Sequence, residues 1–373
     1  MGDVQKSDRH GDQTRTNAGG AARRVLLTVS GAIPTTLDDD VASGRRPRAD
    51  YRVLAEHLDA DVVDVPRARN EGGRLGRLLA RAGAGPILAW YAWRRRRDYD
   101  IILTDGEQVG LPLAFLMRWF GSGRCRHAMI VHVLSVPKKL WLIRLTRIAR
   151  SIDRYIVYSS EQADVVRGLG VPGERVVLTT FMVDTRFFSP VEPSATRPTI
   201  CSAGLERRDY PTLVRAVDGL DVDVVIAAAS PWSRQRDSSE GVRLPSNVTI
   251  ERLPLDELRD LYARSRFVVM PLVDVDFQAG ITTILEAMAM GRAVVCTRTA
   301  GQSDTIDDGA TGIYVPPGDA DALRATIQHL LAAPDECTTL GAAARSWVVE
   351  RAELDRYAER LAAVVGAMLP SDS

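Results

Sequence analysis

Short apolar runs that alternate with longer amphipathic stretches recur along this chain, and this alternation constrains its fold more than any other feature. In the first half, the runs predict strands at residues 24–29, 101–104, 129–133 and 154–158. Strands that alternate with helices form a parallel sheet, and they are apolar throughout because helices cover both faces. The first half of the chain is therefore predicted to be a doubly wound α/β domain.

A second set of the same kind follows a segment with three prolines, which predicts a linker at residues 191–198. Its strands are expected at residues 199–203, 222–227, 247–251, 267–271, 293–296 and 312–315. Its helices are expected at residues 210–217, 255–264, 283–290, 320–331 and 340–368. Two Rossmann-like domains are then expected to face each other across a cleft, with nucleotides bound at the carboxyl ends of the strands.

The expected organisation has five parts. Residues 1–22 lack periodicity and are rich in polar residues, which predicts a disordered tail. The other parts are an N-terminal domain at 23–190, the linker at 191–198, a C-terminal domain at 199–339, and helices at 340–373 that pack back on the N-terminal domain.

Composition excludes several classes of protein. The longest uninterrupted apolar stretch, Gly85–Trp93, covers nine residues, whereas a bilayer-spanning helix needs about 18 to 20. We therefore expect no transmembrane helix, and the polar N-terminus predicts no secretory signal. The four cysteines, Cys125, Cys201, Cys296 and Cys337, show no metal-ligand or redox spacing, so a reduced cytoplasm is the expected setting.

The 48 basic and 48 acidic residues cancel overall, but they are unevenly distributed. Residues 1–190 carry a net charge of +9 and residues 191–373 a net charge of −9, while residues 67–150 hold 17 basic and five acidic side chains. This basic segment predicts either an anionic partner or a solvated face that complements the acidic half, and the sequence leaves both open.

Two stretches of the basic segment combine cations with aromatic side chains, as membrane-surface elements do. In the first, a continuous helix would place Trp141, Leu145, Ile148 and Ile152 on one face, and in the second, residues 90–97, two tryptophans lie beside four arginines. Such a face more often packs on its own sheet, so membrane contact is one of two interpretations. No known nucleic-acid motif accompanies the cations, and no nucleic-acid partner is expected.

The most informative local pattern lies within residues 267–318, where a strand, a loop and a helix follow one another. Gly280 precedes the helix, with Thr282 or Thr283 expected at its cap, so free backbone N–H groups and the positive end of the helix dipole point toward the strand ends. This arrangement predicts a phosphate or diphosphate site. Glu286 lies one or two turns further on, where its carboxylate is placed to accept hydrogen bonds from a ribose.

Three stretches carry a resemblance to a known family. They are Phe-Gln-Ala-Gly-Ile-Thr-Thr-Ile-Leu-Glu-Ala-Met-Ala-Met-Gly at 277–291, Ala-Gly-Gln-Ser-Asp at 300–304 and Asp-Gly-Ala-Thr-Gly-Ile-Tyr-Val-Pro-Pro-Gly-Asp at 308–319. Together they resemble the donor-binding domain of the family 4 retaining glycosyltransferases with the GT-B fold, whose pattern has two acidic residues separated by seven others. Earlier segments fit in the same order, so the resemblance extends from about residue 155 to residue 331.

The resemblance implies a fold and a set of binding residues. The fold is GT-B, with an N-terminal acceptor domain and a C-terminal domain for a nucleotide-sugar donor. Glu286 is then expected to hold the donor ribose, and the backbone of Gly280, Ile281, Thr282 and Thr283 to hold the diphosphate.

Further positions follow from the same resemblance. Arg208, with Arg207 beside it, occupies the basic position where the family neutralises the leaving phosphates, a task that suits a guanidinium fork. Gly204 lets the backbone approach the ligand closely. In the acceptor domain, His132 resembles the family histidine near the donor sugar, and Gly31 lies where the first loop meets donor and acceptor.

One position departs from the family pattern. The first acidic position, eight residues before Glu286, holds Gln278. A glutamine still hydrogen-bonds to sugar hydroxyls, but it supplies no charge, nucleophile or base. In the front-face mechanism of the family the leaving phosphate takes the acceptor proton, so activity is still expected. Gln278 is counted with His132 and Arg208 among the catalytic positions.

Three of these residues also have a purely structural interpretation. Glu286 is alternatively a solvated helix carboxylate. His132, among aliphatic neighbours, is alternatively a hydrogen-bonded core histidine. Arg208 is alternatively the ion-pair partner of Asp209 or Glu206.

The sequence therefore predicts a retaining hexosyltransferase that uses a nucleotide-diphosphate-sugar, with UDP- and GDP-sugars favoured. Two alternatives stay open: a pseudo-glycosyltransferase that couples a nucleotide-activated cyclitol-like unit, and a non-catalytic nucleotide-sugar binding protein. No cofactor or metal is expected, because the helix start and Arg208 supply positive charge. The acceptor is expected to be anionic or lipid-linked, and the protein cytoplasmic, with peripheral contact to the inner face of the cell membrane.

Overall fold

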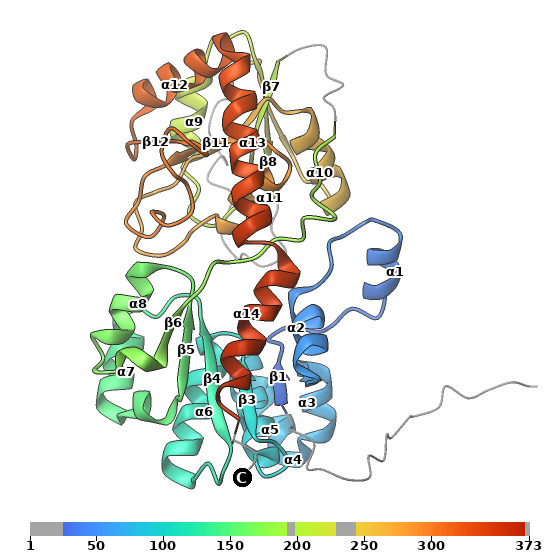
Figure 1. Ribbon diagram of the computed structural model, residues 1–373, viewed down its shortest axis with the longest axis vertical. Coiled ribbons are helices and arrows are strands. Elements are labelled where there is room, and N and C mark those ends of the chain that lie inside the picture. The colour runs from blue at the N-terminus through green and yellow to red at the C-terminus, as the bar shows by residue number, and fades with distance from the viewer. Residues whose placement is uncertain (1–24, 192–197, 229–243, 370–373) are drawn as a thin grey trace, which may run out of the picture.

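The computed structural model describes residues 25–191, 198–228 and 244–369. These residues form two α/β domains stacked along the long axis of the molecule (Figure 1). Each domain is built on a six-stranded parallel sheet, so the predicted fold class is confirmed. The expected tail at 1–22 and residues 192–197 of the expected linker lie outside the described residues.

The sheet of the N-terminal domain has the strand order β2-β1-β3-β4-β5-β6. Its strands are β1 (Val25–Thr28), β2 (Asp61–Val63), β3 (Ile101–Thr104), β4 (Arg126–Val131), β5 (Arg154–Val157) and β6 (Val176–Leu178). All four strands predicted in this half are present. The sequence misses β2 and β6, because three residues are too few to show a period.

Helices cover both faces of this sheet. They are α1 (Leu37–Ala42), α2 (Asp50–Leu58), α3 (Val65–Glu71), α4 (Gly73–Leu79), α5 (Ala84–Arg95), α6 (Glu107–Phe120), α7 (Pro137–Thr146) and α8 (Ser160–Arg167), with 3₁₀ turns at Ala80–Ala82, Ile148–Ser151 and Gly173–Arg175. Successive side chains of a strand point to opposite faces. Thus Val25 and Leu27 pack with α2 on one face, while Leu26 packs with α3, α5 and α6 on the other.

The sheet of the C-terminal domain has the order β12-β11-β10-β7-β8-β9. Its strands are β7 (Thr199–Ala203), β8 (Asp223–Ala227), β9 (Val248–Glu251), β10 (Phe267–Met270), β11 (Ala293–Thr297) and β12 (Ile313–Val315). Its helices are α9 (Tyr210–Val217), α10 (Leu255–Arg264), α11 (Ile281–Ala289), α12 (Ala320–Ala332) and the following α13 (Pro334–Arg351). The predicted bounds of β7, α9 and α10 agree residue for residue with the structure.

The helical structure expected at 340–368 is present, and it consists of two helices with a break between them. α13 ends at Arg351, and α14 (Leu354–Gly366) begins after Glu353, whose carboxylate accepts a hydrogen bond from the Arg356 backbone N–H. The backbone oxygen of Ala352 at this break accepts a hydrogen bond from Val183 in the segment that crosses between the domains (2.9 Å).

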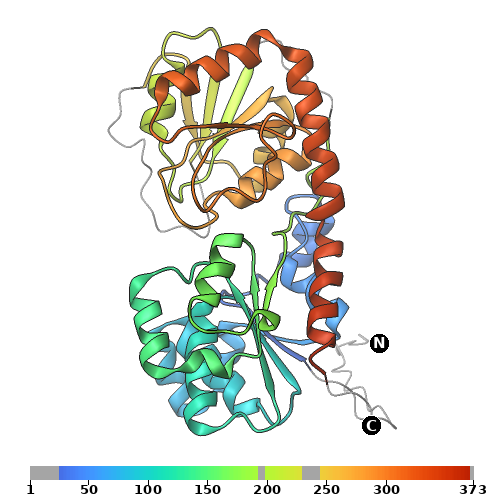
Figure 2. The ribbon, with the colours of Figure 1, turned by 60° about the vertical axis from the view of Figure 1, so that its left-hand side comes forward.

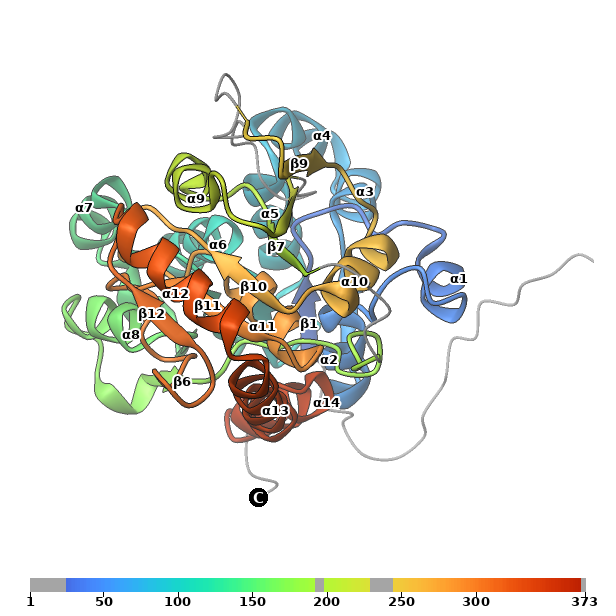
Figure 3. The ribbon, with the colours of Figure 1, turned by 90° about the horizontal axis from the view of Figure 1, so that it is seen from above.

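The last helix belongs to the core of the N-terminal domain. Leu354, Tyr357 and Leu361 of α14 are buried in the cluster that contains Val25 and Leu27. α13 and α14 run along one side of both domains (Figure 2), and seen from above they lie on the opposite side of the molecule from α4 and α5 (Figure 3).

A charge network lies on this side of the molecule, where the chain crosses between the domains. Arg48, in the loop before α2, donates to Asp184 of the crossing segment (2.9 Å) and to Asp355 of α14 (2.8 Å). Arg186 also contacts Asp355 (2.6 Å). The two guanidinium groups therefore tie an N-terminal loop, the crossing segment and the final helix together.

Candidate functional site

The predicted site residues lie where the strand order of each sheet reverses. β1 lies between β2 and β3, and β7 lies between β8 and β10. Open α/β sheets bind ligands at the carboxyl ends of strands at such reversal points. Gly31 follows β1, Gly204 and Arg208 follow β7, and Gly280 follows β10. The topology therefore brings the predicted residues to the two edges where ligands are expected.

Hydrogen bonds between the domains bring these two edges together. The backbone N–H and the hydroxyl of Ser160, at the start of α8, both donate to the carboxylate of Asp304 (2.8 and 2.9 Å). The amide of Gln162 donates to the backbone oxygen of Asp276 (3.4 Å), two residues before Gln278. The loops that carry the two halves of the site therefore touch across the domain boundary.

Arg208 is the central buried group of the C-terminal half, with 5% of its surface exposed. Its Nε donates to the backbone oxygen of Ala203 (2.8 Å), its Nη1 to that of Glu206 (2.6 Å), and its Nη2 to the hydroxyl of Thr283 (3.4 Å). The guanidinium therefore links the loop after β7 to the first turn of α11. Burial lowers the pKa of Arg208.

The backbone around this guanidinium requires two glycines. Gly204 and Gly280 have φ angles of 90° and 78°, which side chains rarely adopt. A Cβ at Gly204 would lie 2.5 Å from Nη2 of Arg208, and one at Gly280 would lie 3.1 Å from Nη1 and 2.9 Å from the sulfur of Met270. The two glycines let the backbone close directly over the buried charge.

The start of α11 differs from the prediction in its cap. The N-cap residue is Gly280, and neither Thr282 nor Thr283 caps the helix. The first intrahelical bond runs from Ile284 to Gly280 (3.0 Å), so the N–H groups of Ile281, Thr282 and Thr283 precede the ladder. Ile281 and Thr283 are buried, whereas Thr282 is exposed. The helix start with free backbone N–H groups is therefore present as expected, with a glycine at the cap.

Glu286 lies in the second turn of α11 with 7% of its surface exposed. Its carboxylate accepts a hydrogen bond from the Tyr262 hydroxyl of α10 (3.0 Å). Burial raises the pKa of Glu286 to about 7, although the bond from Tyr262 and the charge of Arg208 act in the opposite direction. The interpretation of Glu286 as a solvated helix carboxylate is therefore wrong.

Gln278 lies in the loop before α11 and is partly buried. Its side-chain oxygen is covered and meets no hydrogen-bond donor among the described residues. Nearby, Gln302 is fully buried and its amide nitrogen donates to the backbone oxygen of Ala279 (3.0 Å). The hydrogen bond from Gln302 to Ala279 therefore anchors the loop that carries Gln278.

The N-terminal half centres on His132, which follows β4. Its Nε2 lies 3.3 Å from the Asp105 carboxylate, and its backbone N–H donates to Glu107 (3.1 Å). Glu107 also accepts from the Lys139 ammonium (2.7 Å). Gly31 lies in the neighbouring loop, where its backbone oxygen accepts from the N–H of Val65 (3.4 Å).

The His132 side chain is 42% exposed, so the interpretation as a core histidine is wrong. Partial burial disfavours the imidazolium, but the hydrogen bond to Asp105 and the charges of Asp105, Glu107 and Asp50 outweigh it and raise the pKa of His132. Burial and the charge of Asp105 raise the pKa of Asp50 to about 6. The fully buried histidine of this domain is His127, whose pKa burial lowers to about 3.

Two arginines that the sequence treated together separate in the structure. Arg207 is exposed at a φ of 57° and its backbone oxygen accepts from Val273 (3.0 Å). Arg208 points inward, and Asp209 caps α9 by accepting from the Thr212 N–H (3.2 Å). The arginine that reaches the start of α11 is therefore Arg208.

The sequence did not single out three residues of the site. Tyr262 gives no sequence signal, because an aromatic residue in an amphipathic helix is usually part of the core. Asp105 and Glu107 directly follow the predicted strand at 101–104, and acidic residues at a strand end are a signal that could have identified them.

A model of the family Glycosyl transferases group 1 matches residues 207–333, about a third of the chain. The match begins at the arginine pair and ends after α12. It therefore covers α11 and the residues around it, and it leaves the N-terminal domain outside.

Similar curated proteins are glycosyltransferases. The GDP-mannose-dependent alpha-(1-6)-phosphatidylinositol monomannoside mannosyltransferase of Mycolicibacterium smegmatis is 29% identical over 168 residues, covering 42% of this chain and 44% of that protein. The putative colanic acid biosynthesis glycosyltransferase WcaL of Salmonella typhimurium is 26% identical, covering 61% of this chain and 60% of WcaL. The chain thus spans about half the length of these relatives.

Solved structures match over nearly the whole chain. HepE of Anabaena in complex with UDP-glucose has a TM-score of 0.69 at 16% identity, covering 92% of this chain and 99% of HepE. Sucrose-phosphate synthase of Thermosynechococcus elongatus has a TM-score of 0.70 at 19% identity, covering 93% and 99%. At these identities the likeness establishes the fold, which is that of GT-B glycosyltransferases.

Proposed function

We propose that this protein is a GT-B glycosyltransferase that transfers a sugar from a nucleotide-diphosphate-sugar to an acceptor with retention of anomeric configuration. The observation that carries the proposal is the buried Arg208 guanidinium against the N-terminus of α11, with a glycine on either side of it. Fixed positive groups of this kind stabilise the charge of a departing diphosphate without reorganisation.

Each half of the site has a role in this proposal. The N–H groups of Gly280 to Thr283 hold the diphosphate together with Arg208, and Glu286 accepts hydrogen bonds from the ribose hydroxyls. His132 faces the donor sugar from the other domain, with Gly31 in the adjacent loop. The names of similar proteins include both GDP-mannose and UDP-glucose, so UDP- and GDP-sugars are the donors we favour.

The proposed reaction proceeds on one face of the sugar. The acceptor oxygen forms a bond to the anomeric carbon on the face from which the diphosphate leaves, which preserves the configuration. The bond from that carbon to the phosphate oxygen breaks, its electron pair goes to the phosphate, and the acceptor proton passes to the same oxygen. Because Arg208 and the helix start already supply positive charge, we propose that no divalent metal takes part.

The test is a transfer and hydrolysis assay with UDP-, GDP- and ADP-sugars, with the anomeric configuration of the product read by NMR. Glu286→Ala is expected to weaken nucleotide binding, whereas Glu257→Ala, an exposed carboxylate on α10, serves as the matched control. If no nucleotide-sugar binds and Glu286→Ala leaves nucleotide affinity unchanged, the donor-site assignment is wrong. An inverted product would overturn retention alone.

Gln278 supports a second candidate, a pseudo-glycosyltransferase that couples a nucleotide-activated cyclitol-like unit. The family has an acid at this position, and here the side-chain oxygen meets no donor among the described residues. If Gln278→Glu raises sugar transfer, the native site is tuned to another reaction. A non-catalytic binding protein is the third candidate, and acceptor-dependent release of nucleotide diphosphate would exclude it.

A further inference from the structure

Exposed apolar side chains gather on one face of the N-terminal domain. Of the fourteen large apolar side chains that are exposed among the described residues, nine lie between residues 75 and 145. They are Leu75, Leu78, Phe115, Trp119, Phe120, Val136, Trp141, Leu142 and Leu145. All lie on α4, α6 or α7 or at the start of α7, and we call this surface the α4–α7 face.

The structure does not contain the continuous helix that would place Trp141, Leu145, Ile148 and Ile152 on one face. The helix ends at Thr146, because Arg147 adopts a left-handed φ of 54° and a 3₁₀ turn follows. Ile148 and Ile152 are then buried, whereas Trp141 and Leu145 are 65% and 64% exposed. Half of the expected apolar face therefore packs on the sheet, and the other half points into solvent.

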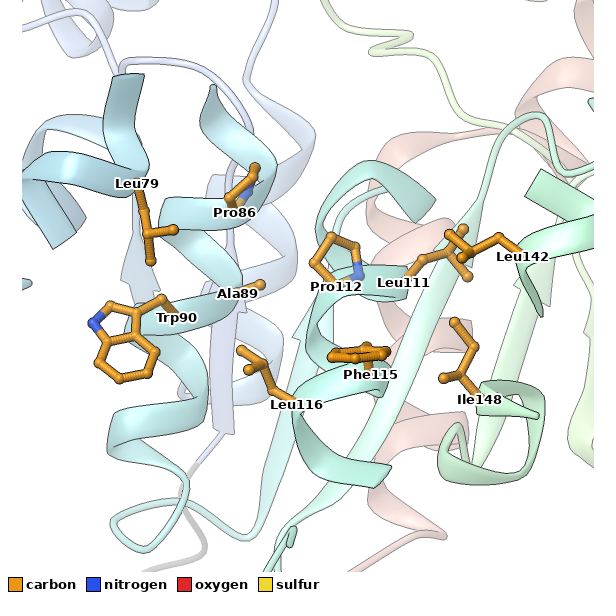
Figure 4. Close-up of a pocket in the computed structure, with 10 residues that line it drawn as sticks. All are labelled: Leu79, Pro86, Ala89, Trp90, Leu111, Pro112, Phe115, Leu116, Leu142 and Ile148. Carbon is orange, nitrogen blue, oxygen red and sulfur yellow. The ribbon is translucent and has the colours of Figure 1, made fainter. Parts of the chain in front are cut away.

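An apolar groove opens on the same face. It has a volume of about 280 Å³ and runs between α5 and α6, with α4 at one end and α7 at the other (Figure 4). Trp90 of α5, Leu116 and Phe115 of α6, and Leu142 of α7 line it, and every other lining residue is also apolar. The groove suits a hydrocarbon chain better than a polar ligand.

The same face is strongly basic. The helices α4 to α7 contain a single acidic residue, Glu107, and it pairs with Lys139. Arg77, Arg118, Lys138 and Arg144 form no ion pair with a carboxylate of the described residues. These cations lie on the same helices, α4, α6 and α7, as the exposed apolar side chains.

The combination of exposed aromatic side chains, an apolar groove and unpaired cations on the α4–α7 face favours one kind of partner. Nucleic acid would meet the cations but would leave the apolar groove and the exposed indoles without a counterpart. The core of a protein interface favours aromatic side chains with few charges, and this face is rich in cations. An anionic bilayer offers phosphates to the cations, an interface to the tryptophans and acyl chains to the groove.

The groove also adjoins the candidate site. Leu111, which lines the groove, lies one turn of α6 after Glu107, about 6 Å along the helix axis. Leu142 lies one turn of α7 after Lys139, which contacts Glu107. The end of the groove at Leu111 and Leu142 therefore adjoins the Glu107–Lys139 pair, and Glu107 also accepts a hydrogen bond from the backbone of His132.

We propose that the α4–α7 face docks on an anionic membrane surface and that its groove takes an acyl chain of an anionic lipid. We further propose that such a lipid presents the acceptor hydroxyl, and this last clause rests on the proposed function. Docking itself does not depend on it.

The first experiment measures co-flotation of the full chain with vesicles of phosphatidylcholine, alone or mixed in equal parts with phosphatidylglycerol. Binding is expected only with phosphatidylglycerol and is expected to weaken with salt. Lys138→Gln with Arg144→Gln should weaken it about 25-fold, at about fivefold per cation. Arg252→Gln with Arg264→Gln, on the C-terminal domain, is the matched control.

A second pair of variants separates apolar insertion from charge attraction. Trp119→Ser with Trp141→Ser is expected to abolish flotation, whereas Leu178→Ser, at a side chain 52% exposed away from this face, should leave it unchanged. All three side chains are exposed, so folding should be preserved. Equal binding to both vesicle types, or an equal loss of binding in the control variants, would overturn docking of this face on an anionic membrane surface.

The groove is tested by lipids brominated along their acyl chains, which quench indole fluorescence on contact. In a chain whose other five tryptophans are replaced by phenylalanine, quenching of Trp90 is expected, and Phe115→Asp should remove it without preventing flotation. Flotation without quenching of Trp90 would overturn acyl-chain binding. A duplex DNA that displaces the vesicles stoichiometrically, or a stable dimer that blocks flotation, would assign the face to another partner.

These experiments read binding, so they stand apart from catalysis. If the protein floats with anionic vesicles but transfers no sugar, docking holds and the proposed function fails. If it transfers sugar to soluble acceptors at the same rate as to vesicle-bound ones, the lipid-acceptor clause fails and the proposed function holds.

Discussion

The two halves of the candidate site are built in opposite ways. In the C-terminal domain, Arg208, Thr283 and Glu286 are buried, and hydrogen bonds within the protein fix each of them. In the N-terminal domain, the side chains of His132 and Asp105 are 42% and 33% exposed and rely on each other. The C-terminal half of the site is therefore preorganised before a ligand arrives, whereas the N-terminal half leaves its polar groups partly exposed to solvent and ligand.

Removing the central cation should have the largest effect. Arg208→Ala is expected to lower the turnover number by about 10² to 10³, because a preorganised positive group is lost. Arg208→Lys should restore only part of it, since an ammonium lacks the guanidinium fork. Turnover is measured with the best donor of the panel.

Arg207→Ala is the control for this variant, because Arg207 is exposed and lies next in sequence. It is expected to change turnover by less than about threefold. Circular dichroism establishes that each variant is folded. If a folded Arg208→Ala protein kept full turnover, the C-terminal half would not act as a preorganised site.

Glu286 gives the preorganised half a pH dependence. Ribose hydroxyls donate to the ionised carboxylate, so nucleotide affinity should rise with pH through about 7. Glu286→Gln should weaken binding by about 10- to 100-fold and abolish this rise, because it removes a charge-assisted hydrogen bond. Isothermal titration calorimetry at several pH values measures both effects.

The same group links stability to pH. The pKa of Glu286 is raised in the folded protein from 4.5 to about 7, so the folded state binds more protons between these values. Stability of the ligand-free protein should therefore fall as pH rises through this window, by roughly 3 kcal/mol. Glu286→Gln should flatten that part of the curve, and an unchanged curve would show that Glu286 does not titrate there.

A matched pair of glycines tests the close approach of backbone and charge. Gly280→Ala combines an unfavourable φ of 78° with contacts to Arg208 and Met270, whereas Gly309→Ala has a φ of 74° and open space. The backbone cost, about 1 to 2 kcal/mol, should be similar in the two variants. Only Gly280→Ala should also weaken nucleotide binding, by about tenfold, and equal affinities would contradict the fit.

The open half should show the smallest effect. Asp105→Asn removes the carboxylate charge that helps to raise the pKa of His132 and leaves a neutral amide oxygen as the hydrogen-bond acceptor. If the imidazolium assists transfer, the rate falls as pH rises through this pKa, and the fall should occur at lower pH in the variant. The expected rate loss at neutral pH is a few-fold, and an unshifted pH profile would remove His132 from the mechanism.

Prediction from sequence succeeded where a local pattern was sufficient. The bounds of β7, α9 and α10 and the position of Gly280 before α11 follow from apolar periodicity and a single glycine. It was insufficient where contacts with residues distant in sequence determine the bounds of an element. The sequence predicts helical structure at 340–368 without a position for the break, and at that break the backbone N–H of Val183, distant in sequence, donates to the oxygen of Ala352.

The residues of the candidate site also divide into features that a local pattern predicts and features that only packing determines. The distance of Glu286 from Gly280 predicts a binding residue, but only the packing of α10 on α11 gives it Tyr262 as a partner and a raised pKa. Arg207 and Arg208 are chemically identical in sequence. The turn after β7 alone determines that one is exposed and the other is buried.

The sequence by itself determined two doubly wound parallel sheets, the helix start that suits an anion, and the excess of cations in the first half. Periodicity, turn residues and charge are properties of a short stretch of chain, so they can be read without its neighbours. The tertiary structure decided which charges are buried and which apolar side chains stay in solvent, as Trp141 and Ile148 show. Burial depends on the elements packed around a residue, and the topology of the whole sheet places those elements.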